Sequence, residues 1–555
     1  MAAVVVTGSG SRLPWHRRWL TGGILRRQLT TAAVLVALVL LLLLTPEVPT
    51  TAGTGGGGFT VPAGVTLPKA PGTPGLTVAG VRCAPGVRQV PFSAYSPICV
   101  PAWHGNNGGA TSPGVTARTI TLVYRVAATN ELQLLYSLLP PTIVGTNDEA
   151  INTMQKYIDV FNRYFELYGR KVVLVPYNGQ GNFIDEDTGS GQAAANADAL
   201  TVATRLHAFA DMSLVDSSVM YTTALEHQHV VSFGLYLQDA SWYQQNEPWQ
   251  YTNGPNCTKT AVAIGALFGR DLAHQDAQYA GDPQLRDEQR TIGILYPENQ
   301  QAAACEQLIH QQLARYGIVP KVEKSIAFDL DKLVSSSQDA MAQLHAAGVT
   351  TVICSSCDPI SPVFMLQAAH EEGYHPEFLM QSYFAGGTTS LDGFVRNELA
   401  KAGTPDEADG ILALGNLTGP RDQQEAIRAY AMANGGSTAG ILPSYAFAYG
   451  PLLYFFDLLQ AAGPYLTPDT LRRAMANTAE LAPTPSGDLG GWSFGAGQVD
   501  PSATYQLLHW DPGTVSPQDG QLGSFDPCFG GRSFEFARNG ADVPSGVAPA
   551  CARLS

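Results

Sequence analysis

The sequence predicts an α/β protein made of two successive halves, each a parallel sheet flanked by helices. From about residue 119 onward, short apolar segments alternate with longer segments of helical periodicity, which is the pattern of βαβ units. A second series of such units begins after the aromatic and polar connector 241–254. The chain of 555 residues is also long enough for two or three domains of about 100 to 200 residues each.

Residues 1–50 are predicted to be a signal peptide or an N-terminal signal anchor. Basic residues precede the apolar run 31–44, and polar residues follow it. This run is shorter than the roughly 20 residues that span a bilayer, so cleavage is physically reasonable. Residues 51–82, rich in Gly, Pro and Thr, are predicted to be a flexible tether. The rest of the chain is expected outside the cytoplasm, at the cell surface or in the periplasm, either secreted or anchored by the hydrophobic segment.

Eight cysteines in an oxidising compartment indicate disulfides. They allow 105 pairings, and the sequence does not choose among them. Our working hypothesis pairs sequence neighbours: Cys83 with Cys99, Cys257 with Cys305, Cys354 with Cys357, and Cys528 with Cys551. Residues 83–118 would then be a small stapled preface, and residues 513–555 a C-terminal tail with a clip of its own.

The first half opens with the β-branched, apolar strand 119–126. Helix 147–168 follows from the helical spacing of its apolar residues, and Gly169 stands where a C-terminal capping glycine is expected. Next come strand 171–178, the Ala-rich helix 192–206 and, up to Leu235, a strand, a helix and a strand. This alternation predicts a parallel sheet covered on both faces.

The second half continues the same alternation. Its expected elements are helix 258–273, strand 291–297, helix 301–317, strand 319–328, helix 331–348, strand 349–356, helix 360–373, and strands 376–382 and 409–417. Three closing helices are expected near 420–433, 443–462 and 468–478, the last with a Thr-Pro-Asp start signal. Strand 504–512 ends the series.

Composition and motifs exclude several classes of function. Only 14% of residues are charged and the net charge is −15, which argues against nucleic-acid binding. The chain has no Gly-x-Ser-x-Gly, His-Glu-x-x-His or phosphate-loop motif, so nothing favours a hydrolase or a nucleotide-binding enzyme. We expect no cofactor and no metal; the pair His227 and His229 has no further ligand nearby in the sequence.

The motif TVICSSCDP places Cys354 and Cys357 after a predicted strand and before a helix. A helix N-terminus lowers a thiol pKa, so a redox dithiol is one interpretation. Zinc would need a second ligand pair of comparable spacing, and none is evident. Because three other cysteine pairs suggest structural use, we favour a structural clip.

Four stretches, 214–234, 290–320, 349–384 and 443–478, resemble in order and spacing the type I periplasmic binding proteins, in particular the branched-chain amino-acid and amide receptors of ABC importers. The likeness covers roughly residues 119–512. It implies a two-lobed clamshell joined by three crossing segments, in which closure traps a ligand. Lobe 1 is then expected at 119–240 and 418–485, and lobe 2 at 250–415 and 504–512.

The resemblance also implies a pocket. Ser217 and Ser218, with backbone N–H groups at a helix start, would receive a ligand carboxylate. The other positions compared with the family's pocket are Gly234, Leu235, Tyr236, Ser355, Ser356, Asp358, Gln381, Ser382 and Tyr383. Trp242, in the aromatic connector, is a further candidate that lines the cleft near a hinge or simply packs it. At the positions where amino-acid binders often carry an acidic residue for the ligand's ammonium group, this chain has Gln381, Ser382 and Tyr383. This difference argues against an α-amino acid as the ligand, unless Asp358 supplies the missing negative charge.

The resemblance therefore implies a non-enzymatic solute-binding protein of an ABC importer. Its partners would be a small polar ligand (an amino acid, an amide or a related organic solute), the permease subunits in the membrane, and the membrane itself through the N-terminal segment. Two alternatives stay open: a membrane-anchored sensor that uses the same clamshell, and an extracytoplasmic thiol-disulfide oxidoreductase centred on Cys354 and Cys357.

Overall fold

The protein is described by a computed structural model in which residues 1–61 and 62–555 form two separate units. The structure describes residues 61–138, 145–234, 238–270, 272–327, 330–354, 361–381, 392, 395–396, 405–441, 448–478 and 489–551. The predicted signal segment and the start of the predicted tether lie outside these residues. Across the described ranges, no helix is both long enough and apolar enough to cross a membrane.

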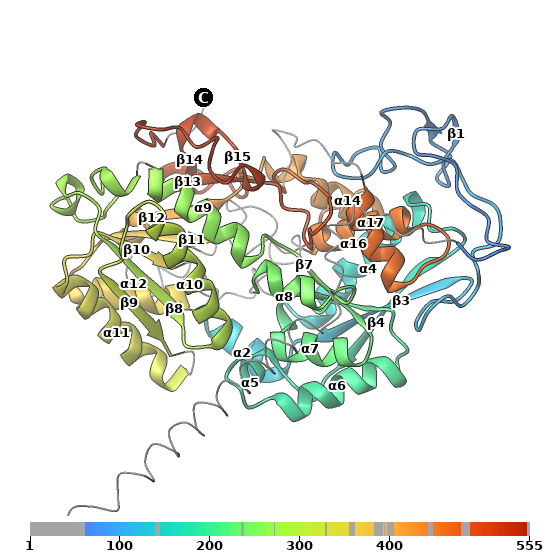
Figure 1. The fold of residues 1–555 in the computed structure, drawn as a ribbon, viewed down its shortest axis with the longest axis horizontal. Coiled ribbons are helices and arrows are strands. Elements are labelled where there is room, and N and C mark those ends of the chain that lie inside the picture. Colours follow the sequence, from blue (N-terminus) through green and yellow to red (C-terminus); the bar gives the residue numbers. More distant parts are fainter. Residues whose placement is uncertain are drawn as a thin grey trace, which may run out of the picture. The chain divides into compact units, whose positions relative to one another are not determined.

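The first sheet of the second unit has five parallel strands in the order β4-β3-β5-β6-β7. Figure 1 labels three of them, β3, β4 and β7. Its strands are β3 (Thr119–Val126), β4 (Lys171–Asn178), β5 (Ala210–Asp211), β6 (Val231–Gly234) and β7 (Gln250–Thr252). β3 and β4 coincide with the predicted strands 119–126 and 171–178. The short β7 was missed, because its three residues lie inside the polar connector.

Helices cover both faces of the first sheet. They are α2 (Thr129–Leu138), α4 (Asn147–Tyr164), α5 (Phe183–Asp187), α6 (Gln192–Thr204), α7 (Val219–His227), α8 (Ala240–Gln245), α14 (Glu425–Ala433), α16 (Tyr449–Ala462) and α17 (Pro468–Asn477). Leu122 and Tyr124 pack with residues of α4 and α16, whereas Val123 packs with α6 and α7. Neighbouring strand residues point to opposite faces, so the sheet is buried on both sides.

The second sheet contains the strand path β14-β13-β12-β11-β10-β8-β9, with β15 paired to β13. Its strands are β8 (Ile292–Pro297), β9 (Val322–Ile326), β10 (Thr351–Cys354), β11 (Glu377–Gln381), β12 (Ile411–Gly415), β13 (Thr504–Val515), β14 (Leu522–Pro527) and β15 (Phe534–Glu535). Strands β8 to β12 are parallel, and β13 and β14 are antiparallel. Helices α9 (Cys257–Arg270) and α10 (Gln300–Ala314) cover one face, and α11 (Leu330–Ala346) and α12 (Ser361–Glu372) the other.

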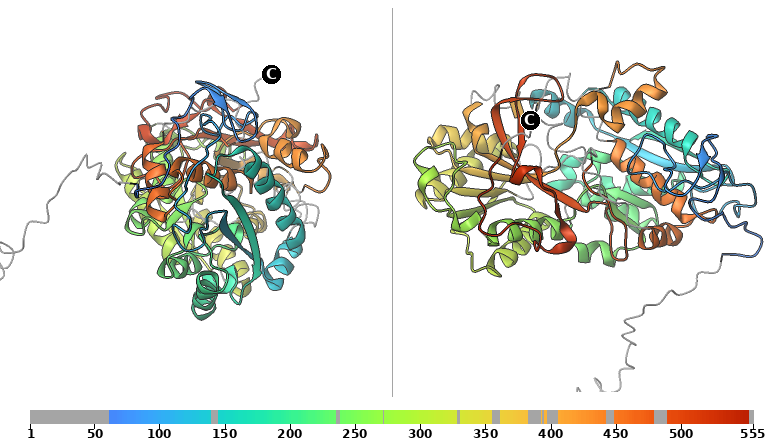
Figure 2. Two further views of the ribbon diagram at one scale, coloured as in Figure 1. Left: turned by 90° about the vertical axis from the view of Figure 1, so that its right-hand side faces the viewer. Right: turned by 90° about the horizontal axis from the view of Figure 1, so that it is seen from above.

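The end of the chain belongs to this second sheet. The predicted strand 504–512 runs on to Val515, and β14 and β15 follow it in the segment that was expected to be a tail (Figure 2). The disulfide Cys528–Cys551 closes this segment, as Cys83–Cys99 and Cys257–Cys305 close others. These are three of the predicted neighbour pairs. Cys354 is also disulfide-bonded, and Cys357 lies outside the described residues.

The first long helix ends earlier than predicted. α4 stops at Tyr164, and Phe165 adopts an extended conformation, so Gly169 is not its capping glycine. The chain leaves the helix because Phe165, Leu167 and Tyr168 are buried in the core. Gly169 instead forms part of the turn into β4, where its φ of 83° favours glycine.

The chain passes three times between the two sheets: from β7 to α9, from β12 to α14, and from α17 to β13. Buried Asp500 ties the first and third passages together, since its carboxylate accepts hydrogen bonds from Asn256 Nδ2 at 3.1 Å and Lys259 Nζ at 2.6 Å. The amide of Thr252 donates to the carbonyl of Val499 at 3.0 Å. The first and third passages are therefore hydrogen-bonded to each other.

Candidate ligand-binding site

The candidate site lies where the strands of the first sheet end. Arg125 is the second-last residue of β3, Asp211 ends β5, and residues 216–218 lead into α7. In open α/β sheets, ligands bind outside the carboxyl ends of the strands. The polar side chains gathered here are therefore the first candidates for ligand contact.

Arg125 is fully buried, and the four N–H groups on Nη1 and Nη2 of its guanidinium each have a protein acceptor. Nη1 and Nη2 bind the two carboxylate oxygens of Glu186 at 2.6 and 2.9 Å. Nη1 also lies 3.3 Å from Asp198 Oδ2, Nε lies 2.7 Å from Asp216 Oδ2, and Nη2 donates to the Asp216 carbonyl at 2.7 Å. The guanidinium carbon stacks 3.8 Å above the ring of Tyr221. We call these five residues the Arg125 cluster.

The cluster carries more negative than positive charge. One guanidinium faces three carboxylates, and Asp211 and Glu131 lie nearby. Burial raises the pKa of Asp216 well above its usual range, although the charge of Arg125 opposes the shift. Burial likewise raises the pKa of Asp211 to about 6, against the hydrogen bonds from Ser213 and Tyr221. This edge of the sheet is acidic, and the four N–H groups on Nη1 and Nη2 of Arg125 are taken up by protein acceptors.

The two predicted serines differ in what they can offer. Ser218 caps α7: its Oγ accepts from the amide of Tyr221 at 2.9 Å and donates to Glu186 Oε2 at 2.5 Å. The protein's own carboxylate thus takes the hydroxyl hydrogen that was predicted for a ligand carboxylate. Ser217 is 2% exposed, and its Oγ has no hydrogen-bond partner in the described part of the chain. Because buried hydroxyls are normally paired, Ser217 is the serine with unused capacity.

Two other predicted residues of this half, Gly234 and Trp242, lie near the first passage between the sheets. Gly234 ends β6, and its carbonyl accepts a hydrogen bond from the amide of Asn253. Trp242 lies on α8, half-buried, with its ring edge-to-face with that of Tyr243 at 5.1 Å. Leu235 and Tyr236 lie outside the described residues.

Most of the predicted residues of the second half are not among the residues that the structure describes. Ser355, Ser356, Asp358, Ser382 and Tyr383 all lie outside the described residues. Gln381 is described only as the last residue of β11, where it is in register with Leu414 of β12.

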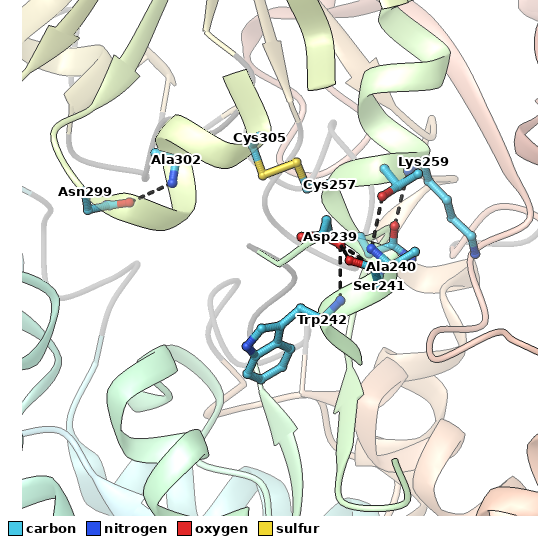
Figure 3. Close-up of a disulfide and its surroundings, with 11 residues drawn as sticks. Asp239, Ala240, Ser241, Trp242, Cys257, Lys259, Asn299, Ala302 and Cys305 are labelled. Carbon is cyan, nitrogen blue, oxygen red and sulfur yellow. Dashed lines mark hydrogen bonds between the residues drawn. A yellow bond between two sulfur atoms is a disulfide. The ribbon is translucent and has the colours of Figure 1, made fainter. Parts of the chain in front are cut away.

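Two helix starts and a disulfide organise the neighbourhood of Trp242 (Figure 3). Asp239 caps α8 by accepting from the amides of Ser241 and Trp242, and the amide of Ala240 donates to Thr258 Oγ1 at the start of α9. The disulfide Cys257–Cys305 joins α9 to α10. Helix α8 is thereby held against a pair of helices that are covalently linked to each other.

Asn299, at the carboxyl end of β8, caps α10 through its Oδ1. Its Nδ2 reaches Asp187 Oδ2, at the end of α5, with a separation of 3.5 Å. This contact joins the strand-end edge of one half to a helix of the other half. The two edges that carry the candidate site therefore approach each other at this point.

Sequence reasoning missed the members of the Arg125 cluster. One signal was present: Arg125 is the only charged residue of the apolar strand 119–126, close to its carboxyl end. Glu186 and Asp198 had no such signal, because each stands in a polar or helical stretch that looks solvent-exposed.

No family model and no curated protein matches the chain. Solved structures do. A leucine-, isoleucine-, valine-, threonine- and alanine-binding protein from Brucella ovis, in its closed conformation, is 15% identical with a TM-score of 0.51, over 76% of this chain and 96% of that one. An ABC transporter solute-binding protein from Rhodopseudomonas palustris BisB5, in complex with 3,4-dihydroxybenzoic acid, is 10% identical with a TM-score of 0.50, over 75% and 97%.

A third structure, the solute-binding protein of an ABC transporter from R. palustris in complex with 4-hydroxybenzoate, is also 10% identical with a TM-score of 0.50, over 73% of this chain and 95% of that one. At these identities the likeness shows the fold. The chain has the two-lobed α/β fold of the type I periplasmic binding proteins, as its sequence predicted.

Proposed function

We propose that the protein is the solute-binding component of an ABC importer, acting outside the cytoplasm and without catalysis. It would take up a small polar solute between its lobes and deliver it to permease subunits in the membrane. The fold supports this proposal, because solved structures that share it are solute-binding proteins: two of ABC transporters in complex with hydroxybenzoates, and one named for the amino acids that it binds. The observation that carries it is Ser217, a buried hydroxyl without a partner at the carboxyl ends of the first sheet.

The proposed mechanism is a shift of the equilibrium between open and closed lobes. A solute that contacts both lobes stabilises the closed form by the difference of its affinities for the two forms. Asp500 and its partners tie the passages between the sheets, whereas Asn299 and Asp187 bridge the strand-end edges. In lobe 2 we propose that Ser355, Ser356, Asp358, Gln381, Ser382 and Tyr383 complete the site, together with Gly234, Leu235, Tyr236 and Trp242 near the passages.

The Arg125 cluster restricts the class of solute. A carboxylate is bound most strongly by a guanidinium with free N–H groups. The four N–H groups on Nη1 and Nη2 of Arg125 already have protein acceptors, and Nε lies 2.7 Å from the Asp216 carboxylate. An extra anion would also add to an acidic edge. We therefore propose that the part of the solute that faces lobe 1 is neutral or cationic, such as an amide, a urea or an amine.

A thermal-shift screen tests the function. The full mature chain is heated with amino acids, amides, ureas, amines and short organic acids, and we expect at least one neutral or cationic solute to raise the melting temperature. If no solute does so, the proposal fails. If only organic acids do so, the fold-based function stands and the proposed solute class is wrong.

Ser217→Ala tests the site. We expect about fivefold weaker binding of the solute found by the screen, because one hydrogen bond is worth about 1 kcal/mol and the same hydroxyl is unpaired without the solute. Stability should change little. Ser337→Ala is the matched control: Ser337 Oγ on α11 is also buried without a partner in the described part of the chain, but lies in the other half. Equal affinity of wild type and Ser217→Ala would remove Ser217 from the site.

A further inference from the structure

A second group of polar side chains lies on α10 and the neighbouring strand, away from the Arg125 cluster. Glu306 and His310 are four residues apart on α10, so they share one face of the helix. Glu323 is the second residue of β9, the edge strand of the second sheet. One ligand atom from each of the three residues lies within 4.8 Å of the others, and His310 Nδ1 is 2.6 Å from Glu323 Oε1.

Glu306 is the buried member of the group. It is 7% exposed, and its Oε1 has no hydrogen-bond partner among the described residues. A buried carboxylate oxygen normally has a partner, because leaving it unpaired costs about 1 to 3 kcal/mol. The atom therefore points to a missing group that carries positive charge or donates a hydrogen bond.

The two carboxylates of the group are close to each other, since one oxygen of Glu306 and one of Glu323 lie within 4.8 Å. Lys324, the next residue of β9, has its Nζ 3.6 Å from Asp339 on α11. Two carboxylates thus lie close together, with the imidazole of His310 as their neighbour.

We propose that Glu306, His310 and Glu323 form a binding site for a divalent transition-metal ion, with Zn²⁺ as the representative ion. One imidazole nitrogen and two carboxylate oxygens are a ligand set that suits Zn²⁺ and its neighbours, whereas Mg²⁺ and Ca²⁺ prefer oxygen ligands alone. His310 and Glu323 have side chains 43% and 31% exposed, so an ion can enter from solvent and keep water as a further ligand.

The bound ion would fasten α10 to the edge strand β9. A metal that binds the folded chain and not the unfolded one raises the melting temperature in proportion to the logarithm of its concentration. The same helix carries Cys305 of the Cys257–Cys305 disulfide, next to Glu306. Helix α10 would then be attached at two adjacent positions, to α9 by a covalent bond and to β9 by the ion. This inference is independent of the proposed solute.

Calorimetry with ZnCl₂ tests the site on the full mature chain without a histidine tag. We expect one ion per chain and a higher melting temperature with Zn²⁺. His310→Gln and Glu306→Gln should each weaken binding by at least about tenfold, the lower end of what loss of a supporting residue costs a metal site. His310 is on the surface, so its variant should fold even if Glu306→Gln does not.

His345→Gln is the matched control. His345 Nδ1 lies 3.2 Å from Glu372 Oε1, so the two residues form an exposed histidine–glutamate pair. Among the described residues this pair belongs to no group of three metal-binding side chains. This variant should bind Zn²⁺ like the wild type. The proposal is overturned if the wild type binds no Zn²⁺, if His310→Gln binds it unchanged, or if Mg²⁺ binds as tightly as Zn²⁺.

Discussion

The two halves each bury an arginine, and the two arginines have opposite surroundings. Arg290 forms a balanced pair in the second half: Nε and Nη2 bind the two carboxylate oxygens of Glu377 at 2.7 and 2.8 Å, and Nη1 donates to the carbonyl of Leu272. Glu377 also accepts from Thr351 Oγ1 at 2.7 Å. Arg125, in contrast, faces three carboxylates.

The two sites also lie at opposite ends of their strands. Arg290 stands just before β8, Thr351 begins β10 and Glu377 begins β11, so this pair joins the amino ends of the second sheet. Arg125 lies at the carboxyl end of the first sheet, where α/β proteins bind ligands. The balanced Arg290–Glu377 pair at the amino ends of the second sheet is structural. The excess of carboxylates around Arg125, at the carboxyl ends of the first sheet, leaves negative charge near the position where a solute would bind.

The largest effect is expected from Arg125→Met. Removing one partner of a buried ion pair costs about 3 to 5 kcal/mol, and here three carboxylates lose their common cation, so we expect at least the upper end of that range. Urea unfolding measures the loss. A cost below about 2 kcal/mol would mean that the carboxylates are already neutral.

Arg290→Met should cost about 3 to 5 kcal/mol, because it leaves Glu377 buried and alone. Adding Glu377→Met should recover at least half of this loss, since buried pairs can be replaced by apolar residues of similar volume. A double-mutant cycle from urea unfolding checks the recovery. The Glu377 carboxylate also accepts a hydrogen bond from the backbone amide of Tyr279 at 3.0 Å. Absence of recovery would show that Thr351 and Tyr279 depend on this carboxylate as much as Arg290 does.

A smaller effect is expected from pH. Burial raises the pKa of Asp211 from 3.8 to about 6, so between these values the folded chain keeps a proton that the unfolded chain releases. Stability contributed by this group therefore falls as pH rises from about 4 to about 6, by roughly 3 kcal/mol. The side chain of Asp211→Asn does not titrate, so the stability of this variant lacks this dependence on pH.

The pH experiment compares unfolding free energies of wild type and Asp211→Asn at pH 4 and pH 7. The wild type should lose stability relative to the variant as pH rises. A difference that does not change with pH would mean that Asp211 titrates at its ordinary value in the fold, and that the edge of the first sheet is wetter than its burial indicates.

Much of the fold could be predicted from local patterns. Strands such as 119–126 are continuous apolar runs because both faces of a parallel sheet are buried, and their alternation with helices specifies the sheet. β14 was not predicted, because its residues, LGSFDP, carry no apolar run and gain their burial only from pairing with β13. The early end of α4 was also not predicted, because it depends on the burial of Phe165 in the core, which is a tertiary contact.

The candidate site was less predictable, for a physical reason. Ser217 and Ser218 stand at a recognisable helix start, but the state of the Ser218 hydroxyl depends on Glu186, which lies 32 residues away in sequence. Glu306, His310 and Glu323 had a partial signal, the four-residue spacing on a helix, yet the third ligand comes from another element. Contacts between distant segments decide both sites.

The connectivity of the second sheet has a consequence for biosynthesis. Strands β8 to β12 are made first, but β12 is paired on its outer side by β13, which follows the helices α14, α16 and α17 of the other half. Until that last part of the chain emerges, β12 presents an open edge that invites pairing with other chains. The first half needs helices α14, α16 and α17, which are made after β12, and the second half needs β13, which is made after those helices. The order of assembly therefore differs from the order of synthesis, and the two lobes complete their folding together.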